Sequence, residues 1–256
     1  MPFTDYPEVN ELLDGLLHQI QLILGTKLVG LYLYGSLVTD DFDRGISDVD
    51  LLAAISSDID EDEFAQLQKM HHDIVDRNKE WDNRIEIAYL SVDALQTYNL
   101  RVSKLAIISP GEPFHVIEAG KDWLMNWYVV REKGIALFGP SPKTIIAPVT
   151  KEEFIQAVTD HAKSWKDWIE HIHSRPSQSY AILTMCRALY AYKNGEQVSK
   201  RQAALWAEKE LPEWASLIRN ALLWREGWRE KGVDHEATFP ETVRFVHFVV
   251  NQIFEK

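Results

Sequence analysis

The segment from Leu31 to Leu52 restricts the fold more than any other part of the chain. A short apolar run ends at Gly35-Ser36, a polar stretch follows, and Asp48-Val49-Asp50 opens a second short apolar run. Such runs, bounded by turn residues, predict buried strands. Because residues two apart on a strand project to the same face, we expect the Asp48 and Asp50 carboxylates to point at one spot. The segment therefore predicts two strands joined by a polar turn, with a pair of acids heading the second strand.

The pair of acids predicts a metal site. Two carboxylates at one spot repel each other unless a cation lies between them, and carboxylate oxygens suit a hard cation such as Mg²⁺. Gly35 lets the backbone approach a phosphate closely, and the Ser36 hydroxyl and amide can donate to phosphate oxygens. Each piece alone is also common in ordinary loops. Their combination indicates a site for magnesium and a nucleotide triphosphate.

A third acid, Glu86, lies in the next strand that the sequence predicts, Arg84–Leu90. It is flanked by Ile85 and Ile87, so its side chain either joins the pair of acids or lies on the solvent face of the strand. A general base must lie within hydrogen-bond reach of the hydroxyl that it deprotonates. We expect Glu86 to be that base and to contribute to the metal site.

The first part of the chain, residues 1–149, is predicted to be a small mixed sheet flanked by helices. Apolar residues recur at helical spacing over Pro7–Leu24. A Pro-Gly pair at Pro110-Gly111 indicates a turn within an otherwise irregular stretch. The other strands are predicted at Lys27–Tyr34, Val49–Ala54, Arg84–Leu90 and Ile135–Phe138. The other helices are predicted at about Glu61–Arg77, from just after Ser91 through Tyr98, and near Lys121–Lys133.

A Gly/Pro cluster at Gly139–Pro142 precedes a change of pattern, and residues 150–256 are predicted to form an all-helical domain. Thr150 followed by acids is a typical helix start. The complete chain is thus predicted to be α+β. The helices are expected near 151–172, 178–193, 198–209, 213–230 and 240–254.

The charge of the chain is divided unevenly. Its formal net charge is −12, and residues 1–150 account for all of it, with 24 acidic and 12 basic side chains. An acidic field repels a phosphate backbone and attracts cations, which disfavours nucleic-acid partners and favours a cationic small molecule. Acidity that merely keeps the protein soluble explains the number equally well.

The single cysteine, Cys186, excludes an internal disulfide framework and favours a reducing compartment. Its position in an apolar helical run favours a small buried side chain over a nucleophile. The sequence contains no apolar run long enough to span a membrane and no signal-peptide pattern at its start. We expect a cytoplasmic protein without a membrane partner.

The segment Gly35–Leu52 resembles the signature of the DNA polymerase β-type nucleotidyltransferase superfamily. This signature is Gly-Ser, a gap, and then Ser-Asp-x-Asp-Leu-Leu, which here is Ser47–Leu52. More of the chain resembles one branch, the aminoglycoside adenylyltransferases that modify streptomycin or spectinomycin. Three segments carry this closer resemblance: Asp122–Pro140, Ile182–Pro212 and Phe245–Val249.

The resemblance implies transfer of AMP from ATP to an antibiotic hydroxyl, with pyrophosphate released. Asp48 and Asp50 would hold magnesium, and Glu86 would deprotonate the acceptor. Lys200 and Arg187, in the helical domain, would contact the phosphates, although without the resemblance they read as ordinary helix-surface charges. The expected nucleotide contacts are Gly35, Ser36, Ser47, Asp122, Arg187 and Lys200.

Two positions depart from the branch. Asp40 stands where the branch carries a glycine after its Gly-Ser turn. Streptomycin-modifying members carry a Trp followed five residues later by an Asp, whereas here Trp168 is followed by His173. We therefore expect spectinomycin or another cationic acceptor rather than streptomycin, with Glu86, Trp168 and His173 contacting it. Trp165 and Trp168 at helical spacing are equally compatible with core packing.

Two other functions fit parts of the pattern. A nucleotidyltransferase-fold antitoxin, or a module that modifies a protein partner, would share the fold. An RNA-tailing enzyme would share the acids but is disfavoured because the chain lacks a basic stripe. The leading expectation is an enzyme that acts as a monomer on ATP and a cationic small molecule.

Overall fold

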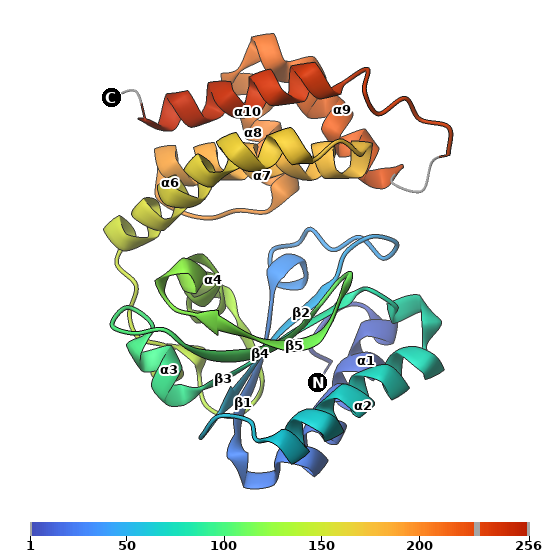
Figure 1. Ribbon diagram of the computed structural model, residues 1–256, viewed down its shortest axis with the longest axis vertical. Coiled ribbons are helices and arrows are strands. Elements are labelled where there is room, and N and C mark those ends of the chain that lie inside the picture. Colours follow the sequence, from blue (N-terminus) through green and yellow to red (C-terminus); the bar gives the residue numbers. More distant parts are fainter. Residues whose placement is uncertain (1, 228–230, 255–256) are drawn as a thin grey trace. The chain divides into compact units, whose positions relative to one another are not determined.

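The computed structural model describes residues 2–227 and 231–254. The chain divides into two compact units, Met1–Val149 and Thr150–Lys256 (Figure 1). The first contains a sheet with helices, and the second is built of helices, so the predicted α+β class is confirmed. No helix in the described ranges is both long enough and apolar enough to cross a bilayer.

The sheet of the first unit has the strand order β5-β4-β3-β2-β1-β6 among the described residues. Strands β2 and β3 run parallel, and every other neighbouring pair is antiparallel. A parallel pair needs a crossover, which helix α2 (Glu61–Arg77) supplies. The strands are β1 (Leu28–Tyr34), β2 (Val49–Ile55), β3 (Ile85–Ser91), β4 (Ser103–Ser109), β5 (Glu112–Ala119) and β6 (Ile135–Phe138).

One expectation for this unit was wrong. The stretch around Pro110-Gly111, predicted to be irregular, is a hairpin of β4 and β5, in which Ser109 pairs with Glu112. Gly111 has a φ of +80°, which suits the second central position of a tight turn. The Pro-Gly turn was recognised, but the strands that flank it were not.

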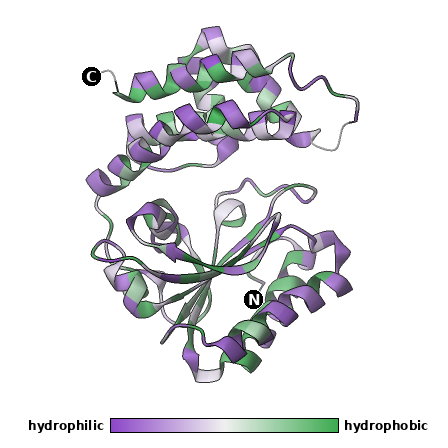
Figure 2. Cartoon of the chain, viewed as in Figure 1, coloured by the Kyte–Doolittle hydropathy of each residue, from purple (hydrophilic) through white to green (hydrophobic). Residues whose placement is uncertain are grey.

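The two faces of the sheet are covered by different helices. Helices α1 (Pro7–Leu24) and α2 pack on one face, and α3 (Val92–Thr97) and α4 (Leu124–Lys133) lie on the other (Figure 1). The core under α1 and α2 contains alternate strand residues, among them Leu33, Leu51 and Ile87. Figure 2 shows apolar residues concentrated in the strands. Because strand side chains alternate, Tyr34, Asp50 and Glu86 project to the opposite face.

The second unit is arranged around one buried helix. Helix α7 (Arg175–Asn194) packs against each of the other long helices of this unit, and Cys186 on it is fully buried, as expected for a structural cysteine. Of the helix predicted near 213–230, residues 228–230 lie outside the described residues. The remaining long helices are α6 (Lys151–Trp168), α8 (Lys200–Glu210), α9 (Ala215–Glu226) and α10 (Phe239–Phe254).

A buried histidine in α2 makes the first unit sensitive to acid. Burial lowers the pKa of His71 to about 3, and its Nε2 lies 3.0 Å from the Tyr89 hydroxyl. The unfolded chain binds a proton near pH 6.5 and the folded chain does not, so stability is complete above that pH and is lost as pH falls toward 3. At pH 5 this single residue is expected to cost about 2 kcal/mol.

His71→Gln should remove this loss while keeping a group that can hydrogen-bond Tyr89. The free energy of unfolding is measured in urea at pH 7 and at pH 5. We expect the decrease between these two pH values to be about 2 kcal/mol smaller in the variant than in the unsubstituted chain. His72→Gln is the matched control, because His72 is the exposed neighbour, 3.1 Å from Asp76. Equal pH dependence in the unsubstituted chain and the His71 variant would contradict the assignment.

Candidate active site

A row of polar side chains crosses the sheet on the face opposite α1 and α2. Tyr34 on β1 pairs in register with Asp50 on β2, and Asp50 pairs with Glu86 on β3. Paired residues on neighbouring strands share a face, so the three side chains lie in line. The Tyr34 hydroxyl donates a hydrogen bond to Oε1 of Glu86 at 3.2 Å. The structure therefore gathers these three groups at one place on the sheet, which we call the acid row.

The hairpin β4–β5 extends the acid row. Ile87 pairs with Ile108 in the antiparallel register of β3 and β4, and Ser109, the next residue of β4, makes a side-chain hydrogen bond with Glu86. Ser109 in turn pairs with Glu112 on β5. Neither Ser109 nor Glu112 was predicted as a site residue, because no strands were expected on either side of Pro110-Gly111.

The surroundings of Glu86 raise its pKa. Burial is the main cause of the raised pKa, and the negative charge of Asp48 raises it further. The hydrogen bonds from Tyr34 and Ser109 act in the opposite direction and lower the pKa, Tyr34 more than Ser109. The pKa of Tyr34 is also raised well above its ordinary value, by burial and by the charges of Glu86 and Asp50. Tyr34 is therefore a neutral donor, and Glu86 is a stronger base than an exposed carboxylate.

The turn between β1 and β2 fits closely around Asp50. Gly35 has a φ of +73°, and a Cβ at this position would overlap the Asp50 carboxylate. The carbonyl of Ser36 accepts hydrogen bonds from the Thr39 and Asp41 amides at 3.3 and 3.2 Å, which keeps the turn tight. A residue with a side chain at position 35 would be strained and would displace Asp50.

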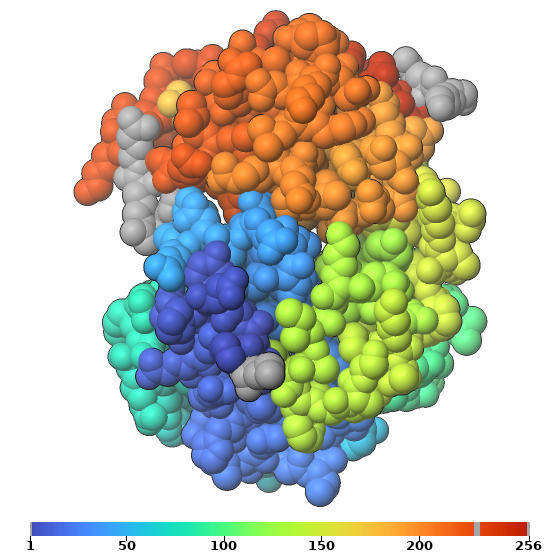
Figure 3. Space-filling model, turned by 180° about the vertical axis from the view of Figure 1, so that it is seen from behind, coloured from blue at the N-terminus to red at the C-terminus, as the bar shows by residue number. Residues whose placement is uncertain are grey.

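Asp40, which stands where the resembling branch carries a glycine, adopts a left-handed backbone conformation. Its φ is +54°, a left-handed value that Asp tolerates better than most residues. The turn between β1 and β2 includes Asp40. It reaches the surface of the unit, where Asp40, Arg44 and Gly45 are exposed (the blue segment in Figure 3).

The end of the turn is held by a residue that the sequence analysis did not single out. The Arg84 guanidinium donates to the Ser47 carbonyl from Nη2 at 2.7 Å and from Nε at 3.1 Å, and it lies 4.9 Å from the Trp81 ring centroid. The hydroxyl of Ser47, which is buried, accepts a hydrogen bond from the Asp43 amide at 2.9 Å. These contacts fix the backbone immediately before Asp48. An arginine at a strand start carries no sequence signal for such a role.

The acids suit magnesium held jointly with a substrate. Within the described part of the chain, no three His, Cys, Asp or Glu side chains are already arranged to enclose a metal ion. Magnesium sites in phosphoryl-transfer enzymes need no such cage, because one or two carboxylates, waters and substrate phosphates complete the octahedron. Because Gly35 has no side chain, the Asp50 carboxylate can lie directly against the turn.

The other predicted nucleotide contacts have these surroundings. Asp122 lies in the short 3-10 helix Lys121–Trp123 just before α4, where its Oδ1 accepts a hydrogen bond from the Gly120 amide at 2.8 Å. In the second unit, the Lys200 ammonium lies 4.3 Å from the Tyr180 ring centroid. Burial, with the charge of Arg187 as a second cause, lowers the pKa of His161. Binding of a nucleotide by Asp122, Lys200 and Arg187 stays a prediction.

The two tryptophans of α6 differ in exposure. Trp165 is 2% exposed and belongs to the core, whereas Trp168 is 54% exposed. The Nδ1 of His173 lies 3.3 Å from Oε1 of Glu236, and its ring centroid lies 4.3 Å from that of Phe239. Trp168 is therefore available to a ligand, while contact of either Trp168 or His173 with an acceptor stays a prediction.

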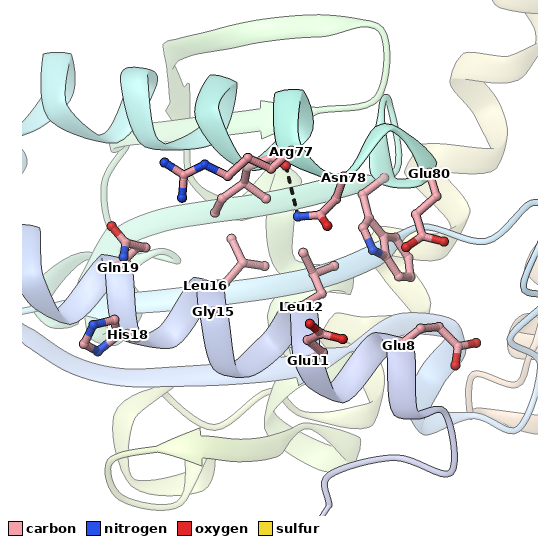
Figure 4. Close-up of a pocket in the computed structure, with 12 residues that line it drawn as sticks. Glu8, Glu11, Leu12, Gly15, Leu16, His18, Gln19, Arg77, Asn78 and Glu80 are labelled. Atoms are coloured by element: carbon pink, nitrogen blue, oxygen red, sulfur yellow. Dashed lines mark hydrogen bonds between the residues drawn. The ribbon is translucent and has the colours of Figure 1, made fainter.

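A pocket of about 300 Å³ lies elsewhere on the first unit. Residues of α1, of α2 and of the turn after α2 line it, with Leu12 and Leu16 at its floor and Glu8, Glu11 and Glu80 around it (Figure 4). Leu12 and Leu16 belong to the core under α1 and α2. This pocket is thus on the opposite face of the sheet from the acid row.

The mixed sheet, the tight Gly-Ser turn and the acid row define a protein of the nucleotidyltransferase fold. Residues 144–252 match the family model of the aminoglycoside adenylyltransferase C-terminal domain. An aminoglycoside (3'') (9) adenylyltransferase of Rhizobium radiobacter is 28% identical over 130 residues, which is 49% of this chain and 45% of that protein. The corresponding protein of Escherichia coli is 27% identical over 128 residues, 48% of this chain and 45% of that protein. The chain thus spans less than half the length of these curated relatives.

A solved structure supports the same assignment of the fold. The spectinomycin adenyltransferase AAD(9) from Enterococcus faecialis, solved with ATP and spectinomycin, has a TM-score of 0.70 to this chain at 16% identity. The alignment covers 93% of this chain and 98% of that one. The resemblance to the aminoglycoside adenylyltransferase branch that the sequence predicts is confirmed.

Proposed function

We propose that this chain transfers AMP from ATP to a hydroxyl of an aminoglycoside-type antibiotic, with spectinomycin favoured over streptomycin, and releases pyrophosphate. The observation that carries the proposal is the acid row, in which Asp50 and Glu86 lie in register beside the turn at Gly35. The family match over residues 144–252 and the fold of the spectinomycin adenyltransferase support it.

The reaction follows from the groups in the acid row. The acceptor hydroxyl oxygen forms a bond to the α-phosphorus of ATP, and Glu86 takes the hydroxyl proton. The bond from the α-phosphorus to the oxygen that bridges the α- and β-phosphates breaks, and this oxygen leaves as part of pyrophosphate. Asp48 and Asp50, with Glu86, would hold Mg²⁺, which supplies neutralisation of the phosphate charge when it is bound. Burial raises the pKa of Glu86, which makes it a stronger base than an exposed carboxylate.

The nucleotide contacts combine backbone, hydroxyl and cationic groups. The backbone at Gly35 can approach a phosphate closely, and the hydroxyls of Ser36 and Ser47 can donate to phosphate oxygens. The first unit carries the whole excess negative charge, so a triphosphate needs cations from outside the acid row. We assign this role to Arg187 and Lys200, and we assign Asp122 to the nucleotide as well.

The acceptor is proposed to be cationic because the acids would attract it. Trp168 offers an exposed aromatic face for a sugar ring, and His173 replaces the acid expected for streptomycin. We further propose that the enzyme acts as a monomer without nucleic acid. Its single, buried cysteine is the basis for a proposed cytoplasmic location.

A panel of aminoglycosides and lincosamides, each incubated with the full chain, ATP and Mg²⁺, tests the proposal by mass spectrometry. We expect AMP added to spectinomycin, one pyrophosphate released for each adduct, and no adduct when Mg²⁺ is chelated. AMP on a protein, with none of the antibiotics modified, would instead favour the protein-modifying alternative. Failure of all acceptors to gain AMP would reject the proposed substrate class.

A further inference from the structure

Strand β1 carries two buried tyrosines with different surroundings. Tyr32 and Tyr34 are two residues apart and therefore share a face of the sheet. The Tyr34 hydroxyl donates to Oε1 of Glu86 at 3.2 Å, whereas the buried Tyr32 hydroxyl has no hydrogen-bond partner among the described residues. The strand thus provides one tyrosine connected to the proposed base and one that is not.

We propose that Tyr34 is a positioning residue, whose hydroxyl holds one carboxylate oxygen of Glu86 so that the other faces the acceptor hydroxyl. This inference rests on the proposed function. Tyr34 comes directly before the turn at Gly35 and pairs with Asp50 across the strands. The Tyr34 side chain therefore connects β1, which leads into the turn at Gly35, with β3, which carries Glu86.

The hydrogen bond has a definite direction. A tyrosine phenol carries its proton at neutral pH and can donate a hydrogen bond, whereas an ionised carboxylate can only accept one. A carboxylate has about four lone-pair sites, so the Tyr34 hydroxyl leaves room for the acceptor proton. Without this bond, Glu86 would gain rotamer freedom, and the fraction of time spent in the reactive orientation would fall.

Tyr34→Phe removes the hydroxyl and keeps the ring. We expect kcat to fall roughly ten- to a hundredfold while KM for ATP and for the antibiotic stay within about twofold. Affinity for a non-hydrolysable ATP analogue with Mg²⁺, measured by calorimetry, should also be unchanged. Tyr32→Phe, the matched control, should leave kcat unchanged, because its hydroxyl has no partner to lose.

A double substitution shows whether Tyr34 acts through Glu86. In a Glu86→Gln background, Tyr34→Phe should lower the residual kcat by less than about twofold, because the base is already gone. Full additivity of the two losses would overturn the inference, as would a Tyr34→Phe variant with the kcat of the unsubstituted enzyme. A parallel rise of KM or a weaker affinity for the analogue would point to a distorted site and would also overturn it.

The proposed function and this inference fail in different ways. If the unsubstituted chain adds no AMP to any acceptor, both are rejected. If the unsubstituted chain is active and Tyr34→Phe turns over equally fast, only the positioning role is rejected.

Discussion

Glu86→Gln is expected to reduce kcat by a factor of about 10² to 10⁴, the range typical of general-base removal. Glutamine keeps the shape of the side chain and can still accept the hydrogen bond from the Tyr34 hydroxyl. It cannot take the acceptor proton. Binding of ATP should survive, because Asp48 and Asp50 remain to hold Mg²⁺ together with the phosphates, while turnover is lost.

Steady-state rates and calorimetry with an ATP analogue and Mg²⁺ measure the two effects of Glu86→Gln separately. Glu118→Gln is a matched control, because Glu118 is an exposed acid on β5 that pairs with Lys104 away from the acid row. It removes the same charge from the same sheet and should leave kcat within about twofold. A Glu86 variant that adenylylates at the unsubstituted rate would show that another group is the base.

Asp50→Asn is expected to abolish measurable turnover, with a loss of roughly a hundredfold or more, and to weaken Mg²⁺-dependent ATP binding as well. Asp50 is central in the acid row, between Tyr34 and Glu86, and its carboxylate lies against the turn at Gly35. Asparagine fits the same space but lacks the charge that a hard cation requires. Both binding and chemistry should therefore fall, unlike the result expected at Glu86.

Titration of activity and of analogue binding with Mg²⁺ tests the Asp50 substitution. Asp40→Asn provides the comparison, since it removes one charge from the exposed part of the same turn at a left-handed position that Asn readily adopts. We expect this control to keep the Mg²⁺ dependence of the unsubstituted chain. An Asp50 variant with unaltered Mg²⁺ dependence would remove Asp50 from the proposed metal site.

Local patterns in the sequence predict the individual elements of the acid row. Alternation around Glu86 predicted a strand with an isolated acid, and the Gly-Ser and Asp-x-Asp spacing predicted the turn. Helices α1 and α2 begin and end at the predicted residues. In α2 the capping box of Asp60 and Glu63 explains this agreement, because a start that is fixed by side-chain hydrogen bonds is visible in the sequence.

Long-range pairing was not predictable in the same way. The register that places Asp50 opposite Glu86 depends on a parallel crossover, and no local pattern specifies which strands become neighbours. The contact between Tyr34 and Glu86 spans two strand spacings and 52 residues of sequence. Ser109 and Glu112 depended on a hairpin whose strands were not recognised, and Arg84 binds a carbonyl 37 residues earlier in the chain.

The close fit of Gly35 against Asp50 limits how this turn can change in evolution. Position 35 is sterically tied to Asp50, whereas position 40 carries an Asp in the left-handed region. The exposed part of the turn around Asp40, away from Gly35, Ser36 and Ser47, can therefore change in composition without disturbing the chemistry. Substitutions in the exposed part of the turn can therefore give rise to new acceptor preferences, while position 35 has to remain glycine.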